Sequence, residues 1–209
     1  MKLAKLALSL LLFTALIGSS GNAIRIFAKA ELAQYLIARS WNKSLATDTP
    51  QPPWAWSDTW PVARLQHQRS QTDLMVLAGA DGSALAFGPG HLASTALPGR
   101  GTSVIAGHRD THFAFLDKIA TDDVLRLQDS SGEWRYYQIV ATEIRNSDTD
   151  PFLVPAEGHW LVLVTCYPFN SLQPGGPLRY IVTARPIESN ANTEPHVAHQ
   201  NTVLAEVSF

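Results

Sequence analysis

Short apolar runs separated by turn residues fill the chain from Val62 to Ile187. Glycine, aspartate, serine and proline stand between the runs, as in GADGSA and DSSGEW. The eight runs that predict strands are VARLQ, DLMVLAG, ALAFGPG, TSVIAGH, DVLRLQD, EWRYYQIVATEIR, HWLVLVTCY and RYIVTARPI. One short helix is predicted among them, around HFAFLDKI. So many short strands in one stretch are typical of a β-barrel or a β-sandwich.

The N-terminus has a different character. Lys2 and Lys5 precede an uncharged apolar run over residues 6–18, and small residues follow it. A basic start before an apolar run of this length is typical of a secretory signal, and the run is short for a membrane span. We therefore expect residues 1–23 to be a signal peptide or a membrane anchor, and the protein to be exported.

Two further segments precede the strand-rich region. Residues 24–43 contain neither proline nor glycine, and apolar residues recur in them at helical spacing. An amphipathic helix is therefore predicted within a spacer over residues 24–49, with Ala28, Leu32, Tyr35 and Leu36 on one face. Residues 47–61 are rich in proline and tryptophan and are predicted to be extended. This segment contains Trp54, Trp56 and Trp60. These tryptophans would form a sugar platform, anchor the chain at a membrane surface, or cover an edge of the domain.

Charge and cysteine content limit the possible functions. The net charge is −2 and there is no long basic run, so nothing indicates nucleic-acid binding. The single cysteine, Cys166, excludes an intramolecular disulfide and a multi-cysteine metal site. Asp148 and Asp150 are too few to predict calcium binding. We expect no metal and no cofactor.

A lone cysteine in an exported domain indicates a reactive thiol or an intermolecular bridge, although a cysteine that ends a strand is often only a buried apolar residue. An imidazole or a cation nearby favours the thiolate. His108 ends the run TSVIAGH, so thiol and imidazole would meet at one rim if both strands point the same way. Arg179 begins another strand after a Gly-Gly-Pro loop and would donate to a developing oxyanion.

These motifs resemble those of the sortase family. VLVTCYPF is similar to the sortase cysteine motif, SVIAGHRD to the histidine motif and LRYIVTA to the arginine strand. LAFGPGH, ALPG and GHRDTHFAFL resemble sortases of Gram-negative bacteria in particular. The resemblance covers residues 50–187, which we take as a sortase catalytic domain, and the polar remainder, residues 188–209, is predicted to be a flexible tail.

The resemblance implies a mainly β fold, a closed eight-stranded sortase-type barrel with one or two short helices and an N-terminal helical segment. It also implies a cysteine transpeptidase. Cys166 would attack a peptide bond in a C-terminal sorting signal of LPxTG-like sequence and hold the acyl group as a thioester. His108 would protonate the departing amine, and Arg179 would stabilise the oxyanion. An amine acceptor of the cell envelope would then resolve the thioester.

Neighbouring residues receive lesser roles. We expect Thr165 to shape the substrate pocket, and His91 either to approach the groove or to be an ordinary loop residue. His112 and Asp110 would orient His108 or cap the short helix. The resemblance places the protein at the inner membrane, with its catalytic domain facing the periplasm. The competing interpretation is a non-catalytic envelope module that binds glycan or peptide, in which the thiol is inert.

Overall fold

The structure, a computed structural model, describes residues 2–150, 152–155, 157–171, 175–187 and 204–207. The chain divides into two compact units, Met1–Leu36 and Ile37–Phe209. The first unit consists of most of helix α1 (Lys2–Thr47), which is longer at both ends than the predicted helix. Leucine- and alanine-rich sequence outweighs the helix cost of Gly18 and Gly21, about 1 kcal/mol each. Over the described residues, no helix combines the length and the hydropathy needed to cross a membrane.

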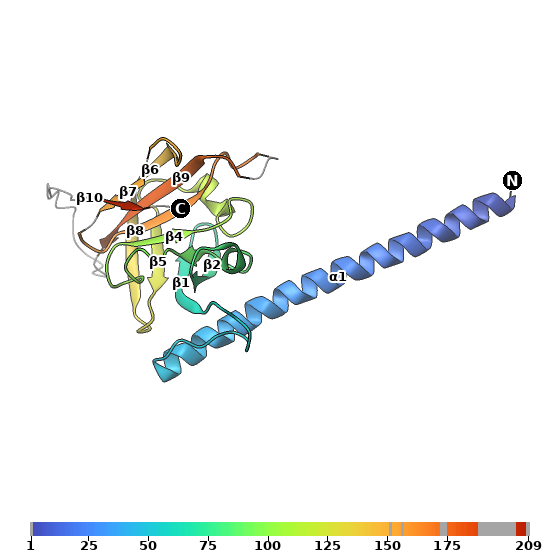
Figure 1. Cartoon of the computed structure of the whole chain (residues 1–209), viewed down its shortest axis with the longest axis horizontal. Coiled ribbons are helices and arrows are strands. Elements are labelled where there is room, and N and C mark those ends of the chain that lie inside the picture. Colours follow the sequence, from blue (N-terminus) through green and yellow to red (C-terminus); the bar gives the residue numbers. More distant parts are fainter. Residues whose placement is uncertain (1, 151, 156, 172–174, 188–203, 208–209) are drawn as a thin grey trace. The chain divides into compact units, whose positions relative to one another are not determined.

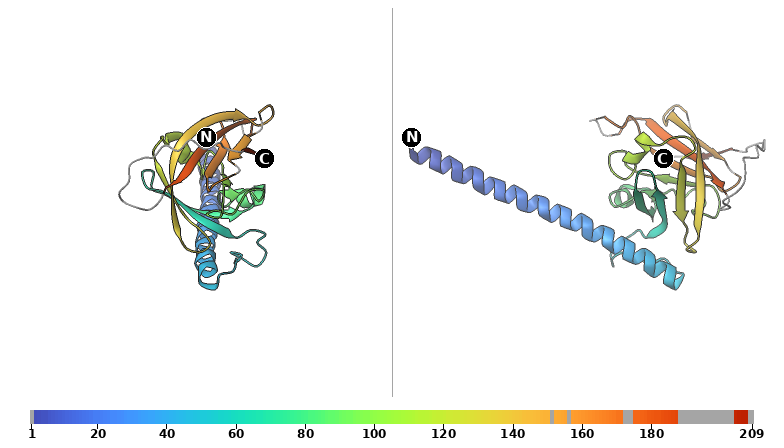
Figure 2. Two further views of the ribbon diagram at one scale, coloured as in Figure 1. Left: turned by 90° about the vertical axis from the view of Figure 1, so that its left-hand side faces the viewer. Right: turned by 180° about the vertical axis from the view of Figure 1, so that it is seen from behind.

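The second unit is built around a closed barrel with the strand order β1-β2-β3-β4-β8-β9-β6-β5 (Figure 1). Neighbouring strands are antiparallel except for the parallel pairs β2–β3 and β4–β8. Figure 2 shows the strands from two further sides. The barrel strands are β1 (Pro61–His67), β2 (Thr72–Ala78), β3 (Gly90–His91), β4 (Ser103–Ala106), β5 (Val124–Gln128), β6 (Trp134–Asn146), β8 (Leu161–Cys166) and β9 (Leu178–Ile187). The predicted mainly β, closed eight-stranded barrel is confirmed.

The run ALAFGPG, which we predicted to be a strand, is mostly not a strand in the structure. Its first residues lie in the short helix α2 (Gly82–Leu85), because the Asp81 carboxylate accepts hydrogen bonds from the backbone N–H groups of Ser83 and Ala84. Only its last residue, Gly90, belongs to β3. A Cβ there would lie 2.1 Å from the carbonyl oxygen of Gly79, so β3 approaches the chain just after β2 too closely for any other residue.

Two elements lie outside the barrel sheet. The predicted short helix is the 3₁₀ helix η1 (Ala114–Lys118). A separate two-stranded sheet pairs β7 (Phe152–Pro155) with β10 (Leu204–Val207). Strand β10 lies within the segment that we predicted to be a flexible tail, because the edge of β7 offers it backbone partners.

Alternation along β8 separates two apolar clusters. Leu161 and Leu163 point into the barrel and pack in its main core. Val162 and Val164 point to the opposite face and belong to a second buried cluster. Since side chains alternate along a strand, Cys166 lies on the same face as Val164. Fold and sequence pattern thus place the thiol outside the barrel core.

Candidate active site

Cys166 and Arg179 form the last residue pair of the antiparallel strands β8 and β9. Side chains of directly opposite residues lie on one face, with Cβ atoms about 4.5–5.5 Å apart. Both residues are half-buried. The sequence alone could not show this pairing, because it depends on the register between the two strands.

His108 reaches the same rim through strand β4. Strands β4 and β8 run in parallel with Ala106 opposite Val164, and the Gly107 N–H donates to the Val164 carbonyl over 3.1 Å. The two strands therefore end side by side, and His108 leaves the sheet next to Cys166. His108 is exposed to solvent. The structure brings the three predicted catalytic residues to one rim.

Thr165 holds the two strand ends together. Its side chain is buried, and its hydroxyl donates a 2.7 Å hydrogen bond to the carbonyl oxygen of Gly107. The residue before the thiol is thus bonded to the residue before the imidazole. Thr165 lies on the inner face of β8, so its role here is to position Gly107.

A tight turn fixes the backbone around His108. The Phe113 N–H donates to the His108 carbonyl over 3.0 Å, and the Phe113 ring is fully buried. A Cβ on Gly107 would lie 2.8 Å from that ring. Glycine is therefore required at this position by the ring that packs against it, a constraint that the sequence motif contains but does not explain.

Arg109 has a role that the sequence analysis missed. Its side chain is 4% exposed, and Nη2 donates to the Ser171 carbonyl over 3.1 Å. Its Nε lies 3.4 Å from an oxygen of the exposed Asp110. Arg109 thereby connects the turn that carries His108 to the loop that follows Cys166. The residue falls within the stretch SVIAGHRD, but only the fold shows where its guanidinium points.

The Arg179 guanidinium is held by its own loop. Nη1 donates to the carbonyl oxygens of Gly176 and Leu178, over 2.6 and 3.2 Å. On the next strand Arg145 lies opposite Arg179, and Asp150 and Glu143 neutralise it. The hydrogen bond to Asp150 is the main reason that the pKa of Arg145 is raised. Arg145 is thus already paired with carboxylates, whereas the hydrogen bonds of Arg179 within the described chain go to neutral carbonyls.

Apolar side chains continue the face on which Cys166 lies. Val164 on β8 and Ile181 on β9 are opposite each other, two pairs along from Cys166 and Arg179. Both are buried in the second cluster with Leu92 and with Val154 of β7. The thiol therefore stands at the end of an apolar row.

His112 lies near His108 in the turn between β4 and η1. Burial is the main cause that lowers the pKa of His112, and the charge of a protonated His108 lowers it further. Burial thus favours the neutral form of the His112 imidazole.

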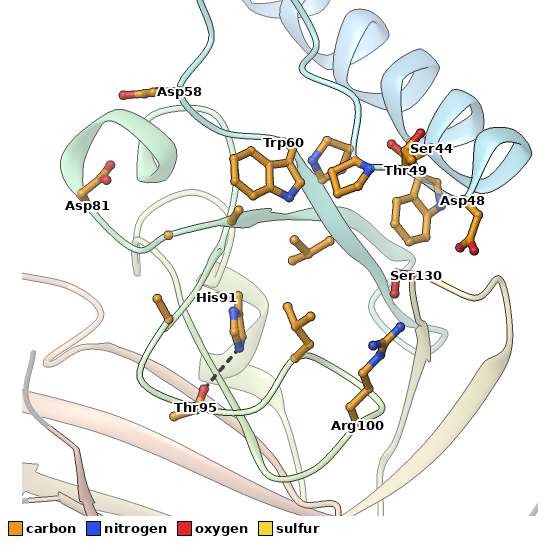
Figure 3. A pocket seen from close by; sticks show the side chains of 18 residues that line it. Ser44, Asp48, Thr49, Asp58, Trp60, Asp81, His91, Thr95, Arg100 and Ser130 are labelled. Atoms are coloured by element: carbon orange, nitrogen blue, oxygen red, sulfur yellow. Dashed lines mark hydrogen bonds between the residues drawn. The ribbon is translucent and has the colours of Figure 1, made fainter.

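His91 lies elsewhere. It is buried on β3, two strands from β8, and its Nε2 donates to the Ala96 carbonyl over 2.9 Å. Burial lowers the pKa of His91, and the bond to Ala96 opposes this shift. The ring lines a cavity of about 610 Å³ to which none of the three rim residues contributes (Figure 3). Its suggested approach to the groove stays a prediction.

Metal binding has little support among the side chains that the structure describes. No three of their histidine, cysteine, aspartate and glutamate groups cluster as ligands of one ion. Asp150, one of the two acidic residues considered for calcium, forms an ion pair of 2.7 Å with Arg145. Cys166 is the one cysteine of the chain, and it is free.

The proteins that this chain resembles in sequence or in fold are sortases. The family model described as the sortase domain matches residues 65–187. Sortase D from Bacillus subtilis (strain 168) is 37% identical over 120 residues, which are 56% of this chain and 60% of the relative. Sortase A from Corynebacterium diphtheriae has a TM-score of 0.55 at 22% identity, with 66% of each chain covered. A Clostridium perfringens Sortase D5 transpeptidase has a TM-score of 0.57 at 20% identity, with 76% of this chain and 99% of that chain covered.

These matches differ in what they support. The two solved structures support the fold. The chain spans only 60% of the length of the curated relative. The family match, in contrast, covers more than half of the chain and includes all three rim residues.

Proposed function

The chain belongs to the sortase family, and we propose that it is a cysteine transpeptidase acting on a protein with a C-terminal sorting signal. The observation that carries the proposal is the pair of Cys166 and Arg179 at the rim that His108 also reaches. Acyl transfer through a thioester needs a nucleophile, an acid–base group and an oxyanion donor. Thiol, imidazole and guanidinium supply these groups in that order.

In the first half-reaction the Cys166 thiolate attacks the carbonyl carbon of the scissile peptide bond. The resulting oxyanion takes the place of the Gly176 carbonyl as acceptor from the Arg179 guanidinium. His108, as imidazolium, gives its proton to the departing amine while the C–N bond breaks. The products are a thioester on Cys166, a neutral imidazole and the released C-terminal fragment.

In the second half-reaction an amine of the cell envelope attacks the thioester carbonyl. Neutral His108 takes a proton from this amine, the new amide bond forms, and the thiolate leaves. Since His108 is exposed, an acceptor reaches it directly from solvent. Water in place of the amine gives hydrolysis.

The preference for an LPxTG-like signal is part of the proposal. The apolar row that ends at Cys166, with Val164 and Ile181, suits an apolar side chain a few residues before the scissile bond. Val154 of β7 closes the other side of this row. The loop that contains β7 would then read the signal.

We also propose export. Lys2 and Lys5 before the apolar run support an N-terminal signal peptide or anchor, with the catalytic domain in the periplasm at the inner membrane. The Gram-negative type of the family stays a prediction from the motifs, and the curated relative reported above comes from Bacillus subtilis.

Intact-mass spectrometry tests the proposed chemistry. The purified chain is incubated with LPxTG-like peptides, with and without an amine acceptor. We expect an acyl adduct that Cys166→Ala abolishes, and a transpeptidation product that is strongly reduced by His108→Ala and by Arg179→Ala. Arg185→Ala is the matched control, because Arg185 lies further along β9 and its guanidinium donates hydrogen bonds to the side chain of Gln138.

The outcomes separate the competing functions. A folded chain whose thiol resists alkylation and accepts no peptide would favour the non-catalytic binding module. A thiol that alkylates rapidly but turns over none of the peptides would retain the chemistry and reject the LPxTG-like signal. Equal losses in Arg185→Ala and Arg179→Ala would remove the oxyanion role from Arg179.

A further inference from the structure

The cavity next to His91 is a concave site in the barrel unit. It is lined by the end of α1, the tryptophan-rich connector, the end of β2 and the loop between β3 and β4, and its volume is about 610 Å³. That size lies within the range of about 300–1,000 Å³ typical of ligand sites. None of Cys166, His108 and Arg179 lines it. The proposed acyl transfer therefore leaves this cavity without a role.

The charges around the cavity are mainly negative. Asp48, Asp58 and Asp81 line it, against one cation, Arg100. Across the part of the chain that the structure describes, none of these four groups belongs to an ion pair. Figure 3 shows Asp58 and Asp81 together at one end and Arg100 at the opposite end. The end with two carboxylates therefore receives no counter-charge from the side chains that the structure describes.

Asp58 and Asp81 are held close to one another by a shared hydroxyl. The Ser83 Oγ lies 2.7 Å from a carboxylate oxygen of Asp81 and 3.3 Å from one of Asp58. A hydroxyl has one proton to donate, so it cannot satisfy both carboxylates at once. Hydrogen bonds from the Ala84 N–H and then from Ser83 lower the pKa of Asp81, which keeps it ionised. Two anions at one rim attract a cation.

An aromatic face lies beside this rim. Trp60 follows Asp58 by two residues, lines the cavity and is 38% exposed (Figure 3). Indole faces attract organic cations, and they also cover the apolar stem that carries the charge. Trp56, by contrast, is 85% exposed and does not line the cavity. The connector thus presents one of its tryptophans to the cavity.

The floor of the cavity is uncharged. The His91 Nε2 donates to a backbone carbonyl, and burial lowers the pKa of this imidazole, so it is neutral near pH 7. Val62, Ala78 and Leu97 add apolar surface. A ligand that fits has an apolar stem over this floor and a positive charge at the rim.

We propose that this cavity binds the lysine side chain of a peptide, with its ammonium group between Asp58 and Asp81 and its methylene stem along Trp60. A neutral sugar would leave the two carboxylates without a counter-charge. A metal ion would make no use of the aromatic face, and the described side chains offer no three-ligand cluster. The site is independent of the acyl transfer at Cys166.

Nuclear magnetic resonance of the isotope-labelled chain tests the site through the indole N–H signals of its six tryptophans. The probe is the blocked tripeptide Gly-Lys-Gly, and the Trp60 signal is assigned with Trp60→Phe. We expect saturable shifts of this signal and an affinity about tenfold higher than for Gly-Nle-Gly, which has the stem without the charge. Raised salt should weaken the binding. Cadaverine separates a free diamine from a peptide side chain, and maltose tests the sugar alternative.

Matched variants locate the binding. Asp58→Asn, followed through the Trp60 signal, should weaken binding of the lysine peptide several-fold. Trp60→Ala, followed through the signal of Trp41, which also lines the cavity, should weaken it to a similar extent. Asp117→Asn, on exposed η1, and Trp56→Ala should leave it unchanged. Cys166→Ala should bind the lysine peptide as the wild type does. A negative result for peptide binding would therefore leave the proposed acyl transfer standing, and the reverse also holds. Equal binding of the norleucine peptide, a preference for cadaverine or maltose, or unchanged binding in both cavity variants would overturn the proposal.

Discussion

The hydroxyl of Thr165 and the carbonyl of Gly107 join the two strands of the candidate active site through one buried hydrogen bond of 2.7 Å. Each residue immediately precedes a catalytic candidate, Cys166 in one case and His108 in the other. A change at Thr165 would therefore reach the residue that carries the imidazole through one intervening residue, Gly107.

Thr165→Val tests this connection, since valine keeps the shape and removes the donor. The Gly107 carbonyl would lose this buried partner, which typically costs about 1–3 kcal/mol. We expect the free energy of unfolding, measured with urea, to fall by that amount, and the rate of acyl-adduct formation to fall as well. Thr142→Val, at an exposed position of β6, is the control. If Thr165→Val reacts at the wild-type rate, the bond does not position His108.

Most strands of the barrel could be predicted from the sequence, because each has a strong local pattern. Alternation and turn residues predicted β1, β2, β4, β5, β6, β8 and β9 close to their observed bounds. The run ALAFGPG was wrong as a strand, since the cap at Asp81 competes locally with strand pairing. Strand β10 has only four residues in a polar segment, and it depends on a partner, β7, that is distant in sequence.

The candidate site could be predicted only in part. Cys166, His108 and Arg179 are each marked by a motif, and their common rim follows from parallel β4 and β8 and the register of β9. Register and side-chain direction are tertiary properties, which explains why the bridging role of Arg109 and the cavity around His91 were not found.

Arg109→Lys should slow peptide transfer more than it lowers the reactivity of the Cys166 thiol, if Arg109 positions His108. Lysine keeps the charge but lacks the planar group whose Nη2 reaches the Ser171 carbonyl. Hydrogen bonds to charged groups contribute about 1.5–3 kcal/mol, so we expect a loss of that order in unfolding free energy. We also expect kcat for peptide transfer to fall more than the rate of thiol alkylation. Arg39→Lys, on the exposed side of α1, is the control, and equal losses in kcat and alkylation would count against positioning.

Buried His91 should make stability depend on pH. Burial lowers its folded-state pKa below the ordinary value of 6.5, so as the pH falls the unfolded chain takes up a proton first. Its contribution to stability is therefore fully present above pH 6.5 and is lost as the pH falls through the lowered pKa. We expect the free energy of unfolding, measured with urea, to decrease less steeply with falling pH in His91→Gln than in the wild type. His67 and His112, whose pKa values burial also lowers, would maintain the rest of the slope. An unchanged slope would show that His91 does not titrate as proposed.

Gly107→Ala should disturb the active site through packing alone. The new methyl group would lie 2.8 Å from the fully buried Phe113 ring, so either the ring or the backbone before His108 must move. Overpacking of this kind typically costs about 1–3 kcal/mol, and we expect a loss of that order in unfolding free energy together with slower transpeptidation. Gly82→Ala is the matched control, because a Cβ at that helical position meets nothing within 4 Å and alanine favours the helix.

A second change, Phe113→Leu, makes room beside the new methyl group and should restore part of the activity lost in Gly107→Ala. If activity stays low while stability recovers, the glycine acts on His108 through backbone conformation and not through contact with the ring.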